Sequence, residues 1–448
     1  MLANLRAVAL VALFTVIASR GFPQGVDRNS APQSPVSQSV PAPQSLDVNA
    51  AVSAYLAKVP PALRARSDAY FEGGYWLLLV DFLYGALVMW VLLHFGLSAG
   101  MRNLAERITR FRPVQHALYW LQFIVMTTLL TSPLTVYEGY FREHRYDLSN
   151  QSFGQWSRDQ AVMLAIAIVF GAPLIMLLFA AVRRLGKTWW IWASLLTIAF
   201  LAFGNLIAPV YFFPLFNQYK PLGDPRVRDP ILSMARAQGI PAKEVYEFDA
   251  SRQSNRVSAN VSGLAGTMRI SLNDNLLNRC TLPEIETTMG HEMGHYVLNH
   301  AYKGLVMNGV LFVVAFAFLG WALNFSLVRW GEKWKVRGLT DPAVLPLAVL
   351  LLSLYFFVLT PVSNTVTRTM EFEADMYGIN AAGQPDGEAN VDLMLGEYRK
   401  LDPGPLEEFI FYDHPSGRTR ITAAMRWKAE HPESANPEEM SRPLWPSK

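Results

Sequence analysis

Six long apolar segments constrain the fold of this 448-residue chain more than any other feature of its sequence. Each has about 20 residues, which as a helix is long enough to cross the hydrocarbon core of a bilayer. In chain order they are Tyr75–Leu97, Ala117–Val136, Ala161–Val182, Trp189–Phe213, Leu305–Val328 and Ala343–Pro361. A soluble protein would have to bury all six in one core, so we predict membrane-spanning helices.

The composition of the chain supports the same class. It is 51% hydrophobic and only 17% charged, whereas soluble domains carry about 25% charged residues. A net charge of +3 without a dense basic run gives no reason to expect a nucleic-acid partner. The single cysteine, Cys280, excludes an internal disulfide and a cysteine-rich metal cluster. We expect an integral protein of the lipid bilayer with a sizeable soluble part.

The N-terminal 20 residues have the pattern of a targeting segment. Arg6 precedes a short apolar run, which is typical of a signal peptide or of a retained first transmembrane helix, and both remain open. The predicted organisation is this targeting segment at 1–20, a Pro/Gln/Ser-rich linker and lead-in at 21–70, four spans at 71–215, a soluble part at 216–303, two spans at 304–362, a second soluble part at 363–430 and a polar tail at 431–448.

Basic residues concentrate in three of the loops between the predicted spans. They are Arg102, Arg107, Arg110 and Arg112 in the first loop, Arg183, Arg184 and Lys187 in the second, and Arg329, Lys333, Lys335 and Arg337 in the third. Counting spans places all three loops on one side of the membrane, which the positive-inside rule makes cytoplasmic. The soluble parts then face the outside. With a signal-like N-terminus, this favours a bacterial inner membrane and a periplasmic site.

The first soluble part has the pattern of a mixed α/β unit. Asp229–Gln238 is predicted to be a helix, and Glu244–Ala250 and Thr267–Leu272 alternate like strands. Thr281 followed by Glu284 forms a capping box and predicts a helix that starts there.

That helix carries the sequence His-Glu-x-x-His. His291 and His295 are four residues apart, so on a helix both imidazoles lie on one face and can reach one Zn²⁺ ion. Glu292 stands beside them and can take a proton from a water molecule at the metal. The pattern predicts a hydrolytic zinc site with one ion per chain.

The third zinc ligand must lie elsewhere in the chain. A longer form of the motif would place a histidine at position 301, but Ala301 stands there and His300 is out of register. Glu371, which lies beyond the last predicted span, is the best candidate, because Asp375 shares its helical face and can bind the free N–H of a ligand histidine. Glu373 points about 160° away on the helical wheel and is expected to be solvated or paired with a basic residue.

The chain resembles the integral-membrane zinc proteases of the type I CAAX prenyl endopeptidase family over roughly residues 70–430. The segments that carry the resemblance are Phe141–Phe153, Ala208-Pro209, Pro214–Asn217, Pro221-Leu222, Val257–Gly263, His291–His300, Arg368–Asp375, and His414-Pro415 with Arg418 and Arg420. Each motif alone is modest, but their order along the chain is specific.

The resemblance implies a mainly α, multi-pass helical barrel with a small α/β metalloprotease domain. Its zinc ligands would be His291, His295 and Glu371, with Glu292 as general base and Asp375 beside a ligand histidine. His414 and Arg420 would stabilise the tetrahedral oxyanion. Four residues, Ser258, Ala259, Asn260 and Val261, would form an edge strand that pairs with the substrate backbone. Ser258 departs from the asparagine that is frequent in the family, and eukaryotic members usually act on the cytoplasmic side.

The expected function is that of a membrane zinc metalloendopeptidase acting on peptide or protein substrates. Two alternatives remain open: a membrane-protein quality-control protease without prenyl specificity, and a non-catalytic membrane chamber or scaffold with a structural zinc. Glu292 argues against the second alternative, because structural zinc sites close their fourth position and have no use for a base. The sequence leaves the oligomeric state open.

Overall fold

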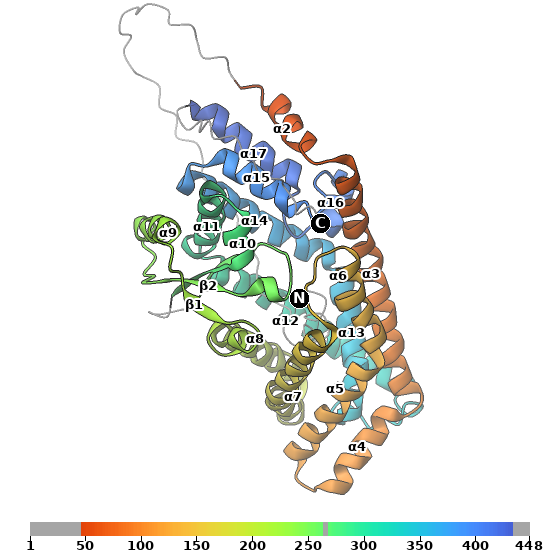
Figure 1. Ribbon diagram of the computed structural model, residues 1–448. Coiled ribbons are helices and arrows are strands. Elements are labelled where there is room, and N and C mark those ends of the chain that lie inside the picture. The colour runs from red at the N-terminus through yellow and green to blue at the C-terminus, as the bar shows by residue number, and fades with distance from the viewer. Residues whose placement is uncertain (1–45, 263–267, 433–448) are drawn as a thin grey trace, which may run out of the picture.

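The computed structural model describes residues 46–262 and 268–432. The predicted targeting segment 1–20, residues 21–45 of the predicted linker and lead-in, and residues 433–448 of the tail lie outside the described residues. Within the described part, helices dominate and one small sheet stands at the side of the molecule (Figure 1).

Five helices of the described part are long and apolar enough to cross a membrane, which confirms the first five predicted spans. They are α3 (Pro61–His94), α5 (Arg112–Val136, continued by the π-helix Tyr137–Arg142 and α6, Glu143–Arg145), α7 (Phe153–Arg184), α8 (Trp189–Ile207) and α12 (His300–Trp330). In each of them, less than half of the most apolar stretch is buried inside the protein, as expected of helices whose solvent is lipid.

The sixth predicted span, Ala343–Pro361, ends where the chain bends. The chain there forms α13 (Leu345–Val358) and α14 (Thr360–Ala382), which meet at a bend of 57°. Pro361 stands in the first turn of α14. A proline lacks the backbone N–H and clashes with the preceding turn, so it begins a new helix more readily than it continues one.

The basic loops gather at the end of the bundle opposite the soluble elements. In Figure 1 this end is marked by α4 (Leu97–Ile108) at the bottom, while the soluble helices α11 (Leu282–Val297), α15 (Pro385–Leu395) and α17 (Gly417–Glu430) lie toward the top. Arg102, which is buried, donates to Asp341, and Arg337 pairs with Glu106 at 2.7 Å. The first and third basic loops are therefore in direct contact.

A four-stranded sheet forms the centre of the first soluble part. Its strands are β1 (Tyr219–Pro221), β2 (Val245–Phe248), β3 (Ala259–Ser262) and β4 (Arg269–Asn273), in the order β1-β2-β4-β3. β2 and β4 run parallel and the other pairs are antiparallel. β2 and β4 confirm the two predicted strands over their described residues. The predicted helix over Asp229–Gln238 is α9 (Pro225–Ala237), which begins earlier because Asp224 caps it.

The remaining soluble helices pack together above the bundle. They are α10 (Asp274–Arg279), α11 (Leu282–Val297), α15 (Pro385–Leu395), α16 (Pro405–Phe411), α17 (Gly417–Glu430) and, from the N-terminal side, α2 (Val48–Ala57). Leu56 of α2 joins a buried apolar cluster with Leu393 of α15 and Ile421 of α17. The lead-in to the first span is thereby attached to the C-terminal helices.

Helices α11 and α14 cross at a point where their backbones touch. A Cβ atom on Gly290 would lie 2.9 Å from the carbonyl oxygen of Gly378, and one on Gly378 would lie 2.7 Å from the backbone nitrogen of His291. Real Cβ atoms do not approach other atoms this closely, so only glycine permits the crossing. The crossing brings His291 on α11 close to the helix that carries Glu371.

We expect Gly290→Ala to destabilise the protein by about 1–3 kcal/mol, the usual cost of overpacking a core. The added methyl group forces α11 away from α14, so metal content should fall as well. Thermal melting and metal analysis of the purified protein measure both effects. Gly204→Ala in α8 is the matched control, because a Cβ there meets nothing within 4 Å, and alanine favours a helix. A Gly290→Ala protein as stable as Gly204→Ala would contradict the assignment.

Candidate metal centre and catalytic site

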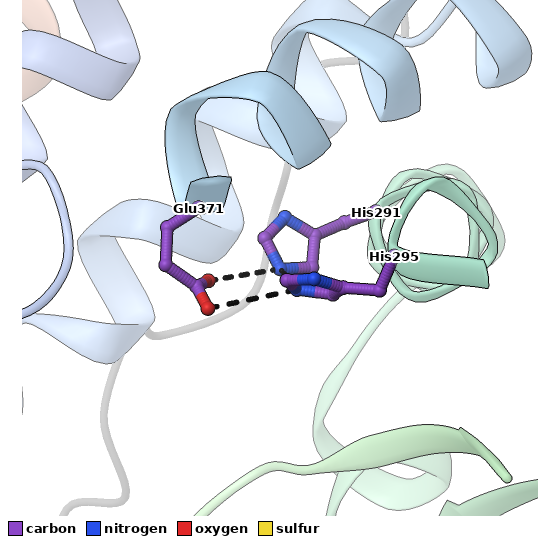
Figure 2. A group of neighbouring side chains, drawn as sticks. All are labelled: His291, His295 and Glu371. Atoms are coloured by element: carbon purple, nitrogen blue, oxygen red, sulfur yellow. Dashed lines mark hydrogen bonds and ion pairs between the residues drawn. The ribbon is translucent and has the colours of Figure 1, made fainter. Parts of the chain in front are cut away.

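The histidines of the motif lie on α11, as predicted. The backbone N–H of Thr281 donates to Oε2 of Glu284 at 2.6 Å, which confirms the capping interaction that starts the helix. The motif occupies the last two turns of α11. Its register directs His291 and His295 toward α14 (Figure 2).

The three predicted metal ligands form one cluster. The Nε2 atoms of His291 and His295 are 3.1 Å apart. Oε2 of Glu371 lies 3.2 Å from His291 Nε2, and Oε1 lies 3.6 Å from His295 Nε2. Figure 2 shows the carboxylate of Glu371 approaching the two imidazoles from the facing helix. Among the described residues, this is the one group whose ligand atoms could hold a metal ion.

The donor set and its geometry fit zinc. Two imidazole nitrogens and one carboxylate oxygen are common ligands of hydrolytic zinc, and Zn–N bonds of about 2.05 Å in a tetrahedron separate the two nitrogens by about 3.3 Å. The observed separation of 3.1 Å is close to this value. The far nitrogens of both rings have partners of their own, so both Nε2 atoms are free to face the same ion.

Asp375 lies directly behind His291. Its Oδ1 is 2.7 Å from His291 Nδ1, the contact expected of a carboxylate that fixes the tautomer of a ligand histidine. The guanidinium of Arg420 in turn donates from Nε to Asp375 Oδ2 at 2.9 Å. Asp375 is therefore held from both sides.

Arg420 is buried among carboxylates. Besides Asp375, its side chain contacts Glu388 at 3.4 Å and Asp392 at 3.1 Å, so each of its three nitrogens faces a carboxylate. Burial raises the pKa of Glu388 and, more strongly, of Asp392, although the charge of Arg420 lowers both. The role at the oxyanion that the resemblance implies for Arg420 stays a prediction. The contacts described here connect it to the zinc cluster through Asp375.

His414 reaches the cluster from the C-terminal part of the chain. Its Nε2 lies 3.2 Å from Oε2 of Glu371, and its Nδ1 lies 2.8 Å from Oδ1 of Asp413. The side chain of His414 is 28% exposed. The sequence analysis missed Asp413, although a carboxylate next to a candidate histidine is a signal that could have been used.

Glu292 lies next to the metal cluster, and its surroundings shift the pKa of its carboxyl group. Burial raises the pKa of its carboxyl group, electrostatic interaction with His291, His295 and His414 lowers it, and the charge of Glu371 raises it. The net direction is upward. A carboxylate that binds a proton more readily than usual is suited to act as a general base near neutral pH.

The predicted substrate strand lies at an edge of the sheet. β3 pairs with β4 on one side and is last in the strand order, so its other side has no strand neighbour among the described residues. Ala259, Asn260 and Val261 belong to it. Ser258 does not, because β3 begins at Ala259; the backbone of Ser258 is instead bonded to Asn273.

A second histidine partner at the site escaped the sequence analysis. Nδ1 of His300 lies 2.9 Å from Nδ1 of His295. Glu373, predicted to be solvated or paired with a basic residue, pairs with Lys303 at 2.9 Å and also with His300 at 3.2 Å. A helical wheel extended from α11 would place position 300 about 140° from His295, on another face. Only the break between α11 and α12 brings the two rings together.

Two family models together match most of the chain. The model described as peptidase family M48 matches residues 221–428. The model described as CAAX prenyl protease N-terminal, five membrane helices, matches residues 49–218. The two matches meet where the bundle gives way to the sheet.

Individual relatives match over similar lengths. The Bacillus subtilis protein named uncharacterized metalloprotease YhfN is 33% identical over 339 residues, which are 75% of this chain and 79% of the relative. CAAX prenyl protease 1 of Saccharomyces cerevisiae is 27% identical over 320 residues, 66% of this chain and 69% of the relative. The crystal structure of S. mikatae Ste24p covers 84% of this chain and 94% of its own at 20% identity, with a TM-score of 0.67. At that identity the structural match shows the fold.

Proposed function

The chain belongs to peptidase family M48, and we propose that His291, His295 and Glu371 bind one zinc ion at its active site. The protein is a multi-pass membrane metalloendopeptidase that resembles the CAAX prenyl proteases. The observation that carries the zinc proposal is the meeting of two imidazole nitrogens and a carboxylate, from two helices, within 4.8 Å. Three protein ligands leave a fourth position for water, as hydrolysis requires.

The side chains around the cluster divide the work of hydrolysis. A bound zinc ion would polarise the scissile carbonyl and make a water molecule more acidic. Glu292 accepts the proton of this water at its carboxylate and delivers it to the leaving amine. When both ring nitrogens of His414 carry protons, Nδ1–H donates to Asp413 and Nε2–H is available to the oxyanion of the tetrahedral intermediate. Asp375 accepts a hydrogen bond from Arg420 and holds the ring of His291 in place through Nδ1.

The substrate is proposed to be an extended polypeptide that adds to the sheet beside β3. Its backbone would pair with Ala259, Asn260 and Val261, as peptides do at open sheet edges. β3 is at the edge of the sheet and packs beside α11, which carries His291 and His295. Backbone pairing with β3 would place the scissile bond near the metal cluster. Such pairing does not require particular side chains in the substrate.

Peptide cleavage by the purified protein in lipid nanodiscs tests the proposal. We expect one zinc ion per chain and cleavage that stops when a chelator removes the metal. N-methylation of the substrate amides that face β3 should abolish cleavage, because it removes the donors needed for pairing. The same peptide with and without a farnesyl group separates CAAX-type processing from general proteolysis. Full activity in metal-free protein would contradict the zinc assignment.

We propose further that the protein lies in a bacterial inner membrane with its active site on the outer, periplasmic side. The support is the three basic loops, which lie at the end of the bundle away from the metal ligands. In intact cells, a membrane-impermeant maleimide should label Lys243→Cys, which is exposed on the first soluble part, and spare Lys187→Cys in the second basic loop. The reverse labelling would place the active site in the cytoplasm.

A further inference from the structure

We propose that His300 and Glu373 form a relay that fixes the ring orientation and tautomer of His295. The inference rests on the proposed role of His295 as a zinc ligand. His300 is 2% exposed. One of its nitrogens faces His295 and the other faces Oε2 of Glu373. Both nitrogens of this buried ring therefore have a polar partner, and the two contacts connect Glu373 to His295 in the metal cluster.

The break between α11 and α12 brings His300 into contact with His295. α11 ends at Val297, and Asn299 adopts a left-handed conformation with φ of 57°. α12 then begins at His300, in a new direction. Asparagine tolerates left-handed φ better than most residues. The turn therefore returns His300 to the face of α11 from which His295 projects.

Hydrogen-bonding rules permit a single proton arrangement when His295 binds zinc through Nε2. The proton of His295 must then reside on Nδ1, which donates to the bare Nδ1 of His300. The proton of His300 must reside on Nε2, which donates to Glu373. Glu373 itself is held by Lys303 at 2.9 Å. The neutral ring of His300 thus connects the carboxylate of Glu373 to the metal ligand His295 through two hydrogen bonds.

The two ligand histidines are consequently supported in different ways. His291 contacts the carboxylate of Asp375 directly, whereas His295 contacts a carboxylate only through a second ring. Outer partners of zinc-binding histidines typically contribute 10–100-fold to metal affinity or activity. His300 and Glu373 are positioning residues in this sense, because their effect reaches the metal through His295.

Zinc affinity of the full-length protein tests the relay, measured by competition with a chromophoric chelator. His300→Leu keeps the approximate volume but removes the acceptor, and we expect about 10–100-fold weaker zinc binding. His300→Gln can accept from His295 through its carbonyl and donate to Glu373 through its amide, so it should restore most of the affinity. The Co²⁺-substituted protein should show an altered visible spectrum in the leucine variant and a near-normal one in the glutamine variant.

Glu373→Ala provides a second route, because Glu373 is partly exposed and its loss should be tolerated. We expect weaker zinc binding in this variant and no additional loss when it is combined with His300→Leu, since Glu373 acts through His300. Asn308→Leu, which replaces another buried polar residue of α12, is the control and should bind zinc like the wild type.

Each outcome of these measurements decides a specific point. Wild-type zinc affinity in His300→Leu, or in Glu373→Ala should the leucine variant fail to fold, would overturn the relay. Losses that multiply in the double variant would overturn it as well, because they would show two independent effects. A wild-type protein that binds no zinc would instead overturn the proposed metal site, so the two failures are distinguishable.

Discussion

Glu292→Gln is expected to abolish peptide cleavage while the protein keeps its metal. The amide has the shape of the carboxylate but cannot accept the proton of the attacking water. Loss of a general acid–base group typically lowers kcat by about 10²–10⁴-fold. Here Glu292 is proposed to serve in both proton transfers, so we expect the upper end of this range. Single-turnover cleavage and zinc analysis on the same preparation measure the two properties.

Glu286→Gln is the matched control for this variant. It makes the same substitution at the fifth residue of the same helix, at a side chain that contacts Gln384 instead of the cluster. We expect wild-type cleavage and metal content. If Glu292→Gln cleaved peptide as well as Glu286→Gln does, another group would have to be the base.

His291→Ala is expected to remove both the metal and the activity. The loss of one ligand leaves two, and it also leaves Asp375 without the ring that it holds. The fall in zinc affinity should exceed the 10–100-fold typical of outer-shell changes. Added zinc should raise the melting temperature of the wild type, because a ligand that binds only the folded state stabilises it. The variant should show no such shift.

His94→Ala controls for the loss of an imidazole. His94 ends α3 and stacks on Trp90, in a different part of the bundle. Its variant should keep the zinc-dependent rise in melting temperature. A His291→Ala protein with full zinc occupancy would contradict the ligand assignment, whatever its activity.

Much of the site could be predicted because its parts are local patterns. The spacing of His291 and His295 fixes a shared helical face, and the spacing of Glu371 and Asp375 does the same on the other helix. The structure brings these two faces together. Apolar length alone predicted five spans correctly, because a bilayer demands about 20 residues of any helix that crosses it.

The parts that sequence could not supply depend on contacts between distant segments. Gly378 looks like any helical glycine until α11 is found against it. Arg420 resembles a free cation in the sequence, and only the packing of α15 shows that carboxylates surround it. His300 is out of register for a metal ligand in the sequence, and it reaches His295 only because the helix breaks at Asn299. In each case the deciding contact joins residues that do not share one continuous helix, so helical periodicity cannot predict it.

The hairpin formed by α12 and α13 has a thermodynamic consequence for the metal centre. The chain between His295 and Glu371 is a loop, and closing a flexible loop of this length would cost about 4 kcal/mol of chain entropy by the logarithmic law. α12 and α13 remove most of this cost, because they fold as a helical hairpin whose aromatic side chains, such as Phe312 and Phe356, contact each other. That hairpin forms in the bilayer. Metal affinity is therefore coupled to the lipid environment, and zinc binding measured in detergent and in bilayers of different thickness should differ accordingly.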